Sequence, residues 1–218
     1  MTEKRKPGRP RASADLREQI LDAAELLFAT HGFAVTPVRD IAANASCNQA
    51  LIRYYFETKE NLFNEVFHRR GGVLAGQRHV LLDALQSRDH PPTVEEVVYA
   101  YLKPQWDMKY SGPSGAAFVQ MQARLHAEPE DYALRLRREV YDPSVKRYIG
   151  VLAELLPDIP RDTLSIRMAF LVGTYLFMLN DLGRLGDMTE GQVYEMGKES
   201  MLAHLVAFLS AGLRAPLP

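Results

Sequence analysis

Hydrophobic residues recur every three or four positions along most of this chain, which is the spacing of helices with one buried face. Leu16, Ile20, Ala23 and Leu27 form such a stripe, and Gly32 follows as a stop signal. No segment alternates apolar and polar residues as a half-buried strand would, and no segment repeats. The pattern therefore predicts an all-α fold.

Residues 36–62 predict two short helices, a tight turn and the capped start of a third helix. Thr36 and Pro37 suit a helix start, because a hydroxyl can cap free amides and proline loses no hydrogen bond at the first position. Asn48 is a suitable cap for a helix over residues 49–55. This is the layout of a helix-turn-helix, whose second helix enters a DNA major groove.

The rest of the chain predicts longer helices. They are expected over residues 59–85, 94–109, 115–127, 131–156, 161–185 and 190–213. Thr58 and Thr93 can cap the first two. Gly71 and Gly72 favour a bend in the first of them, and Pro143 should distort helix 131–156.

We expect the chain to have three regions. Residues 1–12 are predicted to be a disordered basic arm, residues 13–57 a three-helix DNA-binding head, and residues 58–218 a larger helical domain for ligand binding and dimerisation. Residues 168–179 are the longest uncharged apolar run. Because a membrane span needs about 20 apolar residues, we expect a buried helix there and no membrane partner.

Charge and cysteine content narrow the functional class. The net charge is −1, but the first 11 residues hold five basic side chains and one acid. A basic arm on an otherwise nearly neutral protein suits a DNA-binding protein. The single cysteine, Cys47, excludes an intrachain disulfide and fits a reducing cytoplasm, where we expect the protein to act.

The outer face of the second short helix supplies candidate DNA contacts. Gln49 and Arg53 are long enough to reach base edges, where glutamine favours adenine and arginine favours guanine. Phosphate contacts that fix the register are expected from side chains around it. The complete candidate set is Lys4, Arg5, Lys6, Arg9, Arg11, Thr36, Arg39, Asn48, Gln49, Ala50, Arg53, Tyr54, Tyr55 and Lys59.

Aromatic and methionine residues are frequent after residue 95. Together with a few polar residues they predict a pocket for an apolar ligand with one polar end, although each taken singly also fits an ordinary core. The candidate lining is Trp106, Phe118, Met121, Gln122, Arg124, Tyr148 and Tyr175. Gln122 or Arg124 would meet a polar or anionic group of the ligand.

Two apolar stripes near the C-terminus predict a homodimer. Leu171, Tyr175 and Met178 recur at helical spacing, as do Met201, Leu205, Phe208 and Leu209. Such helices can pair with their copies as a four-helix bundle. No spacing of a catalytic set, metal site or nucleotide-binding loop is present, so we expect no enzyme activity, metal or cofactor.

The head resembles the TetR family of bacterial repressors. The matching stretches are GRPR at 8–11, ILDAAELLFATHGF at 20–33, TPVRDIA at 36–42 and NQALIRYYFETKENLF at 48–63. The C-terminal part is similar to fatty-acid-responsive members through PPTVEEVVYAYLKP at 91–104 and RLHAEPED at 124–131. The resemblance implies that Tyr54 or Tyr55, and Lys59, contact phosphate; Arg53 replaces the tyrosine common in this family.

Residue pattern and resemblance together predict a homodimeric regulator that represses transcription from a pseudo-palindromic double-stranded DNA operator. A small apolar, aromatic or acyl effector, the last as a carboxylate or its thioester, would release it by favouring a head spacing that the operator rejects. An activator is a second interpretation. A third is an all-α small-molecule-binding protein or enzyme with a vestigial head, and a gel shift would distinguish it.

Overall fold

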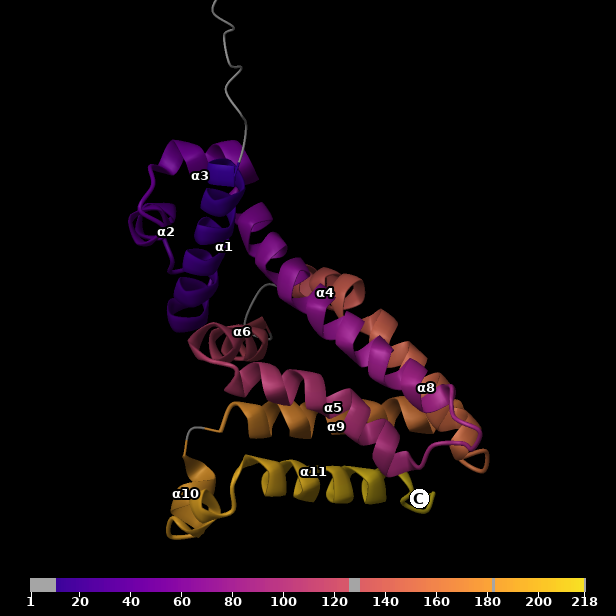
Figure 1. Ribbon diagram of the computed structural model, residues 1–218. Helices are drawn as coiled ribbons and strands as arrows, with labels where there is room; N and C mark the ends of the chain where they lie inside the picture. The colour runs from indigo at the N-terminus through magenta and orange to yellow at the C-terminus, as the bar shows by residue number, and fades with distance from the viewer. Residues whose placement is uncertain (1–10, 126–129, 182, 218) are drawn as a thin grey trace, which may run out of the picture.

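The computed structural model describes residues 11–125, 130–181 and 183–217, and within these ranges all regular structure is helical (Figure 1). The predicted all-α fold is confirmed. The elements are α1 (Arg11–His31), α2 (Val38–Asn44), α3 (Gln49–Phe56), α4 (Lys59–Gln86), α5 (Val94–Tyr110), α6 (Pro113–Arg124), α7 (Glu130–Val140), α8 (Asp142–Leu155), α9 (Arg161–Leu179), α10 (Arg184–Met188), the short 3-10 helix η2 (Gln192–Glu195) and α11 (Lys198–Leu213).

Helices α1 to α3 form the predicted head around an aromatic core. Ile52 and Phe56 point inward from α3 and are buried. Gly32 ends α1 with φ of 85°, a left-handed conformation that favours glycine. The following Phe33 then lies against Phe28, with ring centroids 5.9 Å apart, which is the contact expected of this helix end.

The start of α2 differs from the prediction. Pro37 is the N-cap residue and α2 begins at Val38, without a side-chain cap. The Thr36 hydroxyl is buried and donates to the carbonyl of Gly32 at 2.7 Å. Thr36 therefore fastens the end of α1 to the start of α2, and the prediction that its hydroxyl caps amides is wrong.

Helix α4 leads from the head along one side of the molecule (Figure 1). It begins as predicted at Thr58, whose hydroxyl oxygen accepts from the Asn61 amide at 3.0 Å. The helix runs unbroken through Gly71, where a bend is expected from the sequence. A Cβ atom at Gly71 would lie 2.0 Å from a methyl carbon of Val140, so this glycine permits close packing of α7.

The later helix boundaries reflect proline and glycine. Pro143 lies in the first turn of α8, just after the break at Tyr141, so residues 131–156 form two helices instead of one distorted helix. Gly183, Gly191 and Gly197 all have positive φ, and they break the predicted helices 161–185 and 190–213 into shorter elements. Thr93 and Glu96 form the reciprocal cap that starts α5.

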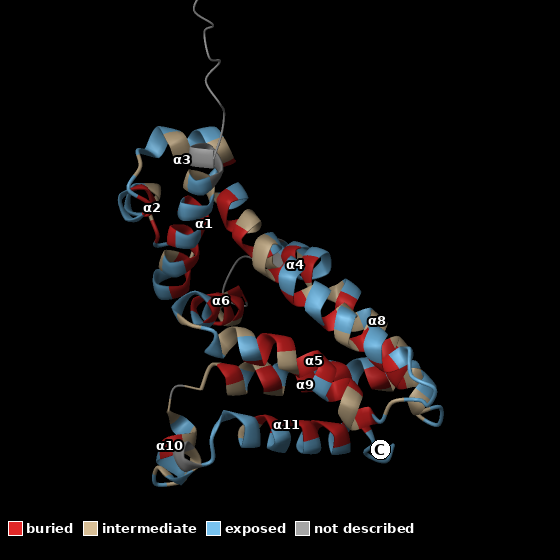
Figure 2. Ribbon diagram, in the orientation of Figure 1, coloured by how far each residue is buried: buried red, intermediate tan, exposed pale blue. Residues whose placement is uncertain are grey.

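Two hydrophobic clusters stabilise the chain. The first joins α1 to α4 with residues of α6 and α7, including Phe118 and Leu136. The second joins α4, α5, α8, α9 and α11. Figure 2 shows both as buried stripes on facing helices. Because α6 lies against α1, the first cluster contains residues of both the head and the C-terminal part. The predicted boundary at residue 57 falls between α3 and α4.

Candidate DNA surface and ligand cavity

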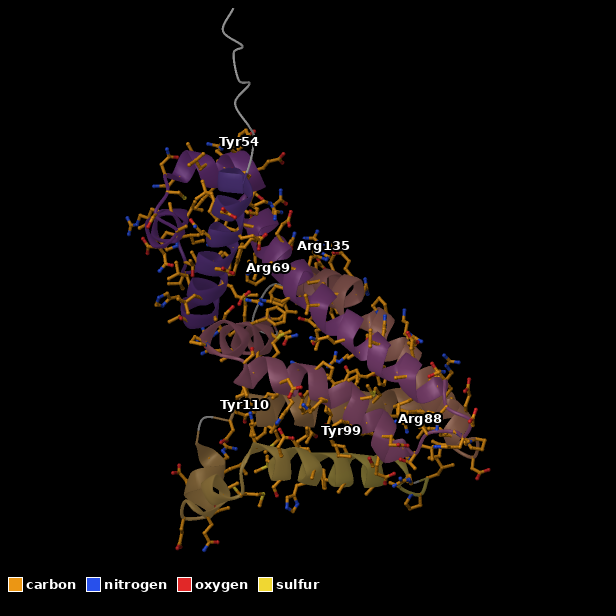
Figure 3. All side chains as sticks on the ribbon, in the orientation of Figure 1. Tyr54, Arg69, Arg88, Tyr99, Tyr110 and Arg135 are labelled. Atoms are coloured by element: carbon orange, nitrogen blue, oxygen red, sulfur yellow. The ribbon has the colours of Figure 1, made fainter. Side chains whose placement is uncertain are left out.

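Helix α3 presents a polar outer face at the tip of the head. Gln49, Ala50, Arg53 and Tyr54 are exposed, as predicted. Tyr54 is 71% exposed and points away from the head core (Figure 3). The Asn48 side chain accepts from the Leu51 amide at 3.0 Å and so fixes the start of this helix. A rigid helix with long exposed polar side chains can contact base edges in a major groove.

The side chains around α3 differ in how they are held. Lys59 is the first residue of α4, and its ammonium lies 4.5 Å from the Phe33 ring centroid and donates to the Ala34 carbonyl at 3.4 Å. Tyr55 is half-buried against the head core, with its ring 5.3 Å from that of Tyr54. Arg39 is well exposed and pairs with Asp40 at 3.2 Å. These side chains can set register on phosphates without reading bases.

Some residues predicted to contact DNA are not found on the described DNA-facing surface. The Thr36 side chain is 1% exposed, so the prediction that it contacts DNA is wrong. Lys4, Arg5, Lys6 and Arg9 lie outside the described residues. Arg11 begins α1, and its side chain is also outside the described part of the chain.

A buried ion-pair cluster that the sequence analysis missed joins the head to the C-terminal part. Glu25 on α1 is fully buried and accepts from Arg69 at 3.0 Å, from Arg70 at 2.8 Å and from Ser114 at 2.7 Å. Arg69 lies at the junction of α1 and α4 (Figure 3). Burial lowers its pKa, but the hydrogen bonds to Glu18 and Glu25 outweigh that effect and raise it. We name these four residues, Glu25, Arg69, Arg70 and Ser114, the Glu25 cluster.

A cavity of about 670 Å³ lies among α4 to α9. Its lining is mostly apolar, with a few polar side chains, which is typical of sites for small molecules. The lining residues are Arg78, Tyr101, Gln105, Gln122, Leu125, Ala133, Leu134, Arg137, Tyr141, Asp142, Val145, Ser165, Met168, Ala169, Val172, Gly173, Tyr175 and Leu176. The predicted pocket therefore has a counterpart in the structure.

Four polar residues of this cavity form a connected chain of hydrogen bonds. Arg78 donates to Gln105 at 3.1 Å, and Gln105 donates to Gln122 at 2.7 Å. Gln122 then donates to the hydroxyl of Tyr141. Burial raises the pKa of Tyr141, which keeps this hydroxyl protonated. We name Arg78, Gln105, Gln122 and Tyr141 the Arg78 network.

Of the seven residues predicted to line the pocket, Gln122 and Tyr175 lie at this cavity and the other five do not. Phe118 and Met121 belong to the head cluster, and Trp106 packs in the second cluster with its ring 5.2 Å from Tyr110. Tyr148 is fully buried outside the lining, and its hydroxyl donates to the Arg78 carbonyl at 2.7 Å. Arg124 lies beside Gly32 at the end of α1.

Arg78 and Gln105 of the Arg78 network were missed, whereas Tyr141 is one of the aromatic residues after residue 95 from which a pocket is predicted. Arg78 occupies a helical stripe with Leu74 and Leu82, both buried. A charged residue within an apolar stripe is a signal that could have identified it, because a buried charge needs compensation.

Helices α9 and α11 keep apolar side chains exposed on one face. On α9, Ile166, Phe170 and Phe177 are 55%, 68% and 56% exposed, and Phe208 on α11 is 69% exposed. Figure 2 shows the exposed face of α11 on the side away from the rest of the chain. The stripes predicted to pair between chains are largely internal instead, since Leu171, Tyr175, Leu205 and Leu209 are buried. We name Ile166, Phe170, Phe177 and Phe208 the α9–α11 face.

Helix α9 is long and apolar enough to span a membrane by length and composition alone, and 28% of its most apolar 18-residue stretch is buried. It packs against α5, α6, α8 and α11. The prediction of a buried helix at 168–179 therefore holds for one side only, and the α9–α11 face is the other side. Among the described residues no cluster of histidine, cysteine or acidic side chains is arranged to hold a metal ion.

Comparison with known families matches both parts of the chain. Residues 99–212 match the family described as tetracyclin repressor-like, C-terminal domain, and residues 20–66 match bacterial regulatory proteins, tetR family. The HTH-type transcriptional repressor KstR2 of Mycolicibacterium smegmatis is 32% identical over 81 residues, covering 37% of this chain and 40% of that protein. The repressor Rv3405c of Mycobacterium tuberculosis is 37% identical over 70 residues, covering 32% and 37%. The chain thus matches about two fifths of the length of these relatives.

Solved structures resemble nearly the whole chain. The fatty acid degradation regulator FadR from Bacillus halodurans superposes with a TM-score of 0.62 at 18% identity, covering 97% of this chain and 100% of that one. A TetR-family transcriptional regulator from Bordetella parapertussis gives 0.68 at 17% identity, covering 94% and 98%. At such identities the likeness establishes the fold.

Proposed function

This chain belongs to the TetR family, and from that premise we propose that it is a DNA-binding transcriptional repressor controlled by a small molecule. The observation that carries the proposal is the outer face of α3. Its cap at Asn48 fixes the helix, and Gln49, Arg53 and Tyr54 project from it into solvent. Base edges would be read by Gln49 and Arg53, while Tyr54, Tyr55, Arg39, Lys59 and the basic arm would hold phosphates.

The protein would act as a homodimer through the α9–α11 face. Large exposed apolar side chains on two adjacent helices are unusual for a monomer and favour burial against a second copy. A two-fold dimer would place its two heads on the half-sites of a pseudo-palindromic operator. We infer a cytoplasmic protein with a head over residues 13–57 and a ligand-binding and dimerisation domain over 58–218.

The effector would bind in the cavity and act on the heads through α4. This helix carries Arg78 at the cavity and Lys59 beside α3, so one continuous element joins both sites. The Glu25 cluster ties the same helix to α1. A ligand that prefers one position of α4 would shift the population of head spacings and so release the operator.

A gel shift with the DNA upstream of the protein's own gene tests the proposal. We expect a shifted complex that survives an excess of random DNA and disappears after addition of the effector. If neither this fragment nor any genomic fragment is retained, the alternative of a small-molecule-binding protein or enzyme with a vestigial head replaces the regulator.

A further inference from the structure

The Arg78 guanidinium is a buried charge without an ionic partner in the described part of the chain. Arg78 is 2% exposed, and its Nε donates to the Tyr101 carbonyl at 2.9 Å. Its guanidinium also lies 3.8 Å from the Tyr101 ring centroid. The ion pairs that join described residues all involve other side chains, so only neutral groups meet this cation. A buried charge is costly unless a counter-charge faces it.

The direction of every hydrogen bond in the Arg78 network follows from this arginine. Arginine has only donors, so Gln105 must present its carbonyl oxygen to Arg78 and its NH₂ group to Gln122. Gln122 in turn presents its carbonyl oxygen to Gln105 and its NH₂ group to the Tyr141 oxygen. The Tyr141 hydroxyl is thus an acceptor in this chain, and its own hydrogen remains to be donated elsewhere.

Both ends of the network therefore favour an acceptor, and the Arg78 end favours a negative one. No hydrogen bond donated by the Tyr141 hydroxyl joins two described residues. The second arginine of the lining, Arg137, is half-exposed and balanced by Asp142 at 3.5 Å. The cavity consequently carries one uncompensated positive charge.

Apolar side chains form most of the remaining wall of the cavity. They include Leu125, Val145, Met168, Val172 and Leu176, and the cavity of about 670 Å³ is large enough for an extended or aromatic body. We propose that the cavity binds an amphipathic organic carboxylate, with the carboxylate held by Arg78 and Tyr141 and the apolar body against this wall. This inference rests on the proposed function and names the chemical class of its effector.

Calorimetry on the protein free of DNA tests the inference. The probes are the straight-chain carboxylates from hexanoate to tetradecanoate, each beside the alcohol of equal length, all kept below their micelle concentrations. Because a hydrogen bond to a charged group contributes about 1.5–3 kcal/mol, the wild-type protein should bind the best carboxylate about tenfold or more tightly than its alcohol.

Variants then assign this preference to named residues. Arg78→Gln should weaken carboxylate binding about tenfold or more and change alcohol binding less than about threefold. Tyr141→Phe should weaken carboxylate binding less, by about threefold to tenfold. The matched control is Arg147→Gln, since Arg147 pairs with Asp83 on the outer side of α8 and does not line the cavity. It should leave both affinities unchanged.

The outcomes separate this inference from the proposed function. If Arg78→Gln melts at too low a temperature to be assayed, Arg78→Lys, which keeps the charge and loses the planar fork, takes its place and should retain a reduced preference for carboxylates. Alcohols that bind as tightly as carboxylates at every length, or no binding by any carboxylate, overturn the inference. So does an unchanged carboxylate affinity in Arg78→Gln. A protein that prefers carboxylates yet retains no DNA supports the inference and overturns the proposed function.

Discussion

The head and the cavity use polar side chains in opposite ways. On α3, Gln49, Arg53 and Tyr54 point outward into solvent, where the proposed DNA contacts would be made. In the cavity, Arg78 and Gln105 point inward, where each hydrogen bond must be supplied by protein or ligand. The outward set can change without harm to the fold, whereas the inward set couples binding to stability.

The Glu25 cluster joins these two regions. Like the polar residues of the cavity, its buried carboxylate needs partners from the protein itself. Its carboxylate is fully buried between two arginines, so it holds α1 against α4 by balancing charge. Movement of α4 at the cavity would therefore be transmitted to the head with little loss. Substitutions in each region, with measurements of stability, assembly and DNA binding, test this difference between the head and the cavity.

The largest effect is expected at the junction. Glu25→Ala would leave Arg69 and Arg70 partly buried without this carboxylate, and we expect the free energy of unfolding to fall by about 3 kcal/mol. Urea denaturation measures it, with the exposed Glu154→Ala as control. A loss no greater than that of the control would show that the cluster does not hold the head.

The second-largest effect is expected on the proposed dimer. Phe170→Glu with Phe208→Glu places charges on the α9–α11 face, and we expect dimer dissociation to become at least about 100-fold more favourable, or about 2.7 kcal/mol. Light scattering should report a monomer with an unchanged helix content. Val80→Glu, on an exposed apolar residue of α4, is the control and should stay dimeric. A double variant that remains dimeric places the interface elsewhere.

Base reading should be a smaller, sequence-dependent effect. Gln49→Ala is expected to cost about 1–3 kcal/mol on the operator and little on random DNA, because one amide contact to a base edge is lost. Fluorescence anisotropy on both DNAs measures the difference. Equal losses on the two would assign Gln49 to the DNA backbone.

The smallest effect is expected at Lys59. Lys59→Ala should weaken binding to all DNA sequences alike and reduce the slope of log affinity against log salt by about 1 unit. The same anisotropy assay, repeated across salt concentrations, measures the slope. An unchanged slope would assign Lys59 to the contacts with Phe33 and Ala34 alone.

The sequence predicted local structure better than it predicted the cavity. The caps at Asn48, Thr58 and Thr93 act within one turn of helix, so their residue types were sufficient. Cavity lining depends on how distant helices pack, and residue type alone did not separate Trp106 in the core from Tyr175 at the cavity.

The same limit explains the other errors. Thr36 has the residue type of a cap, but its hydroxyl is taken by the Gly32 carbonyl. Tyr175 and Leu205 share helices with Phe170 and Phe208, and only the tertiary packing decides which stripe is internal. Gly183 and Gly197 precede the starts of α10 and α11 with positive φ, which a glycine permits but does not require.

Selection of genomic DNA fragments on the immobilised protein tests the central claim most directly. Three proteins are compared: the wild type, a head variant with Gln49→Ala, Arg53→Ala and Tyr54→Ala, and a cavity variant with Gln122→Ala. We predict that the wild type and the cavity variant enrich the same inverted repeat and that the head variant enriches none. Enrichment of that repeat by the head variant, or no enrichment by the wild type, would contradict the assignment of α3 as the DNA-reading helix.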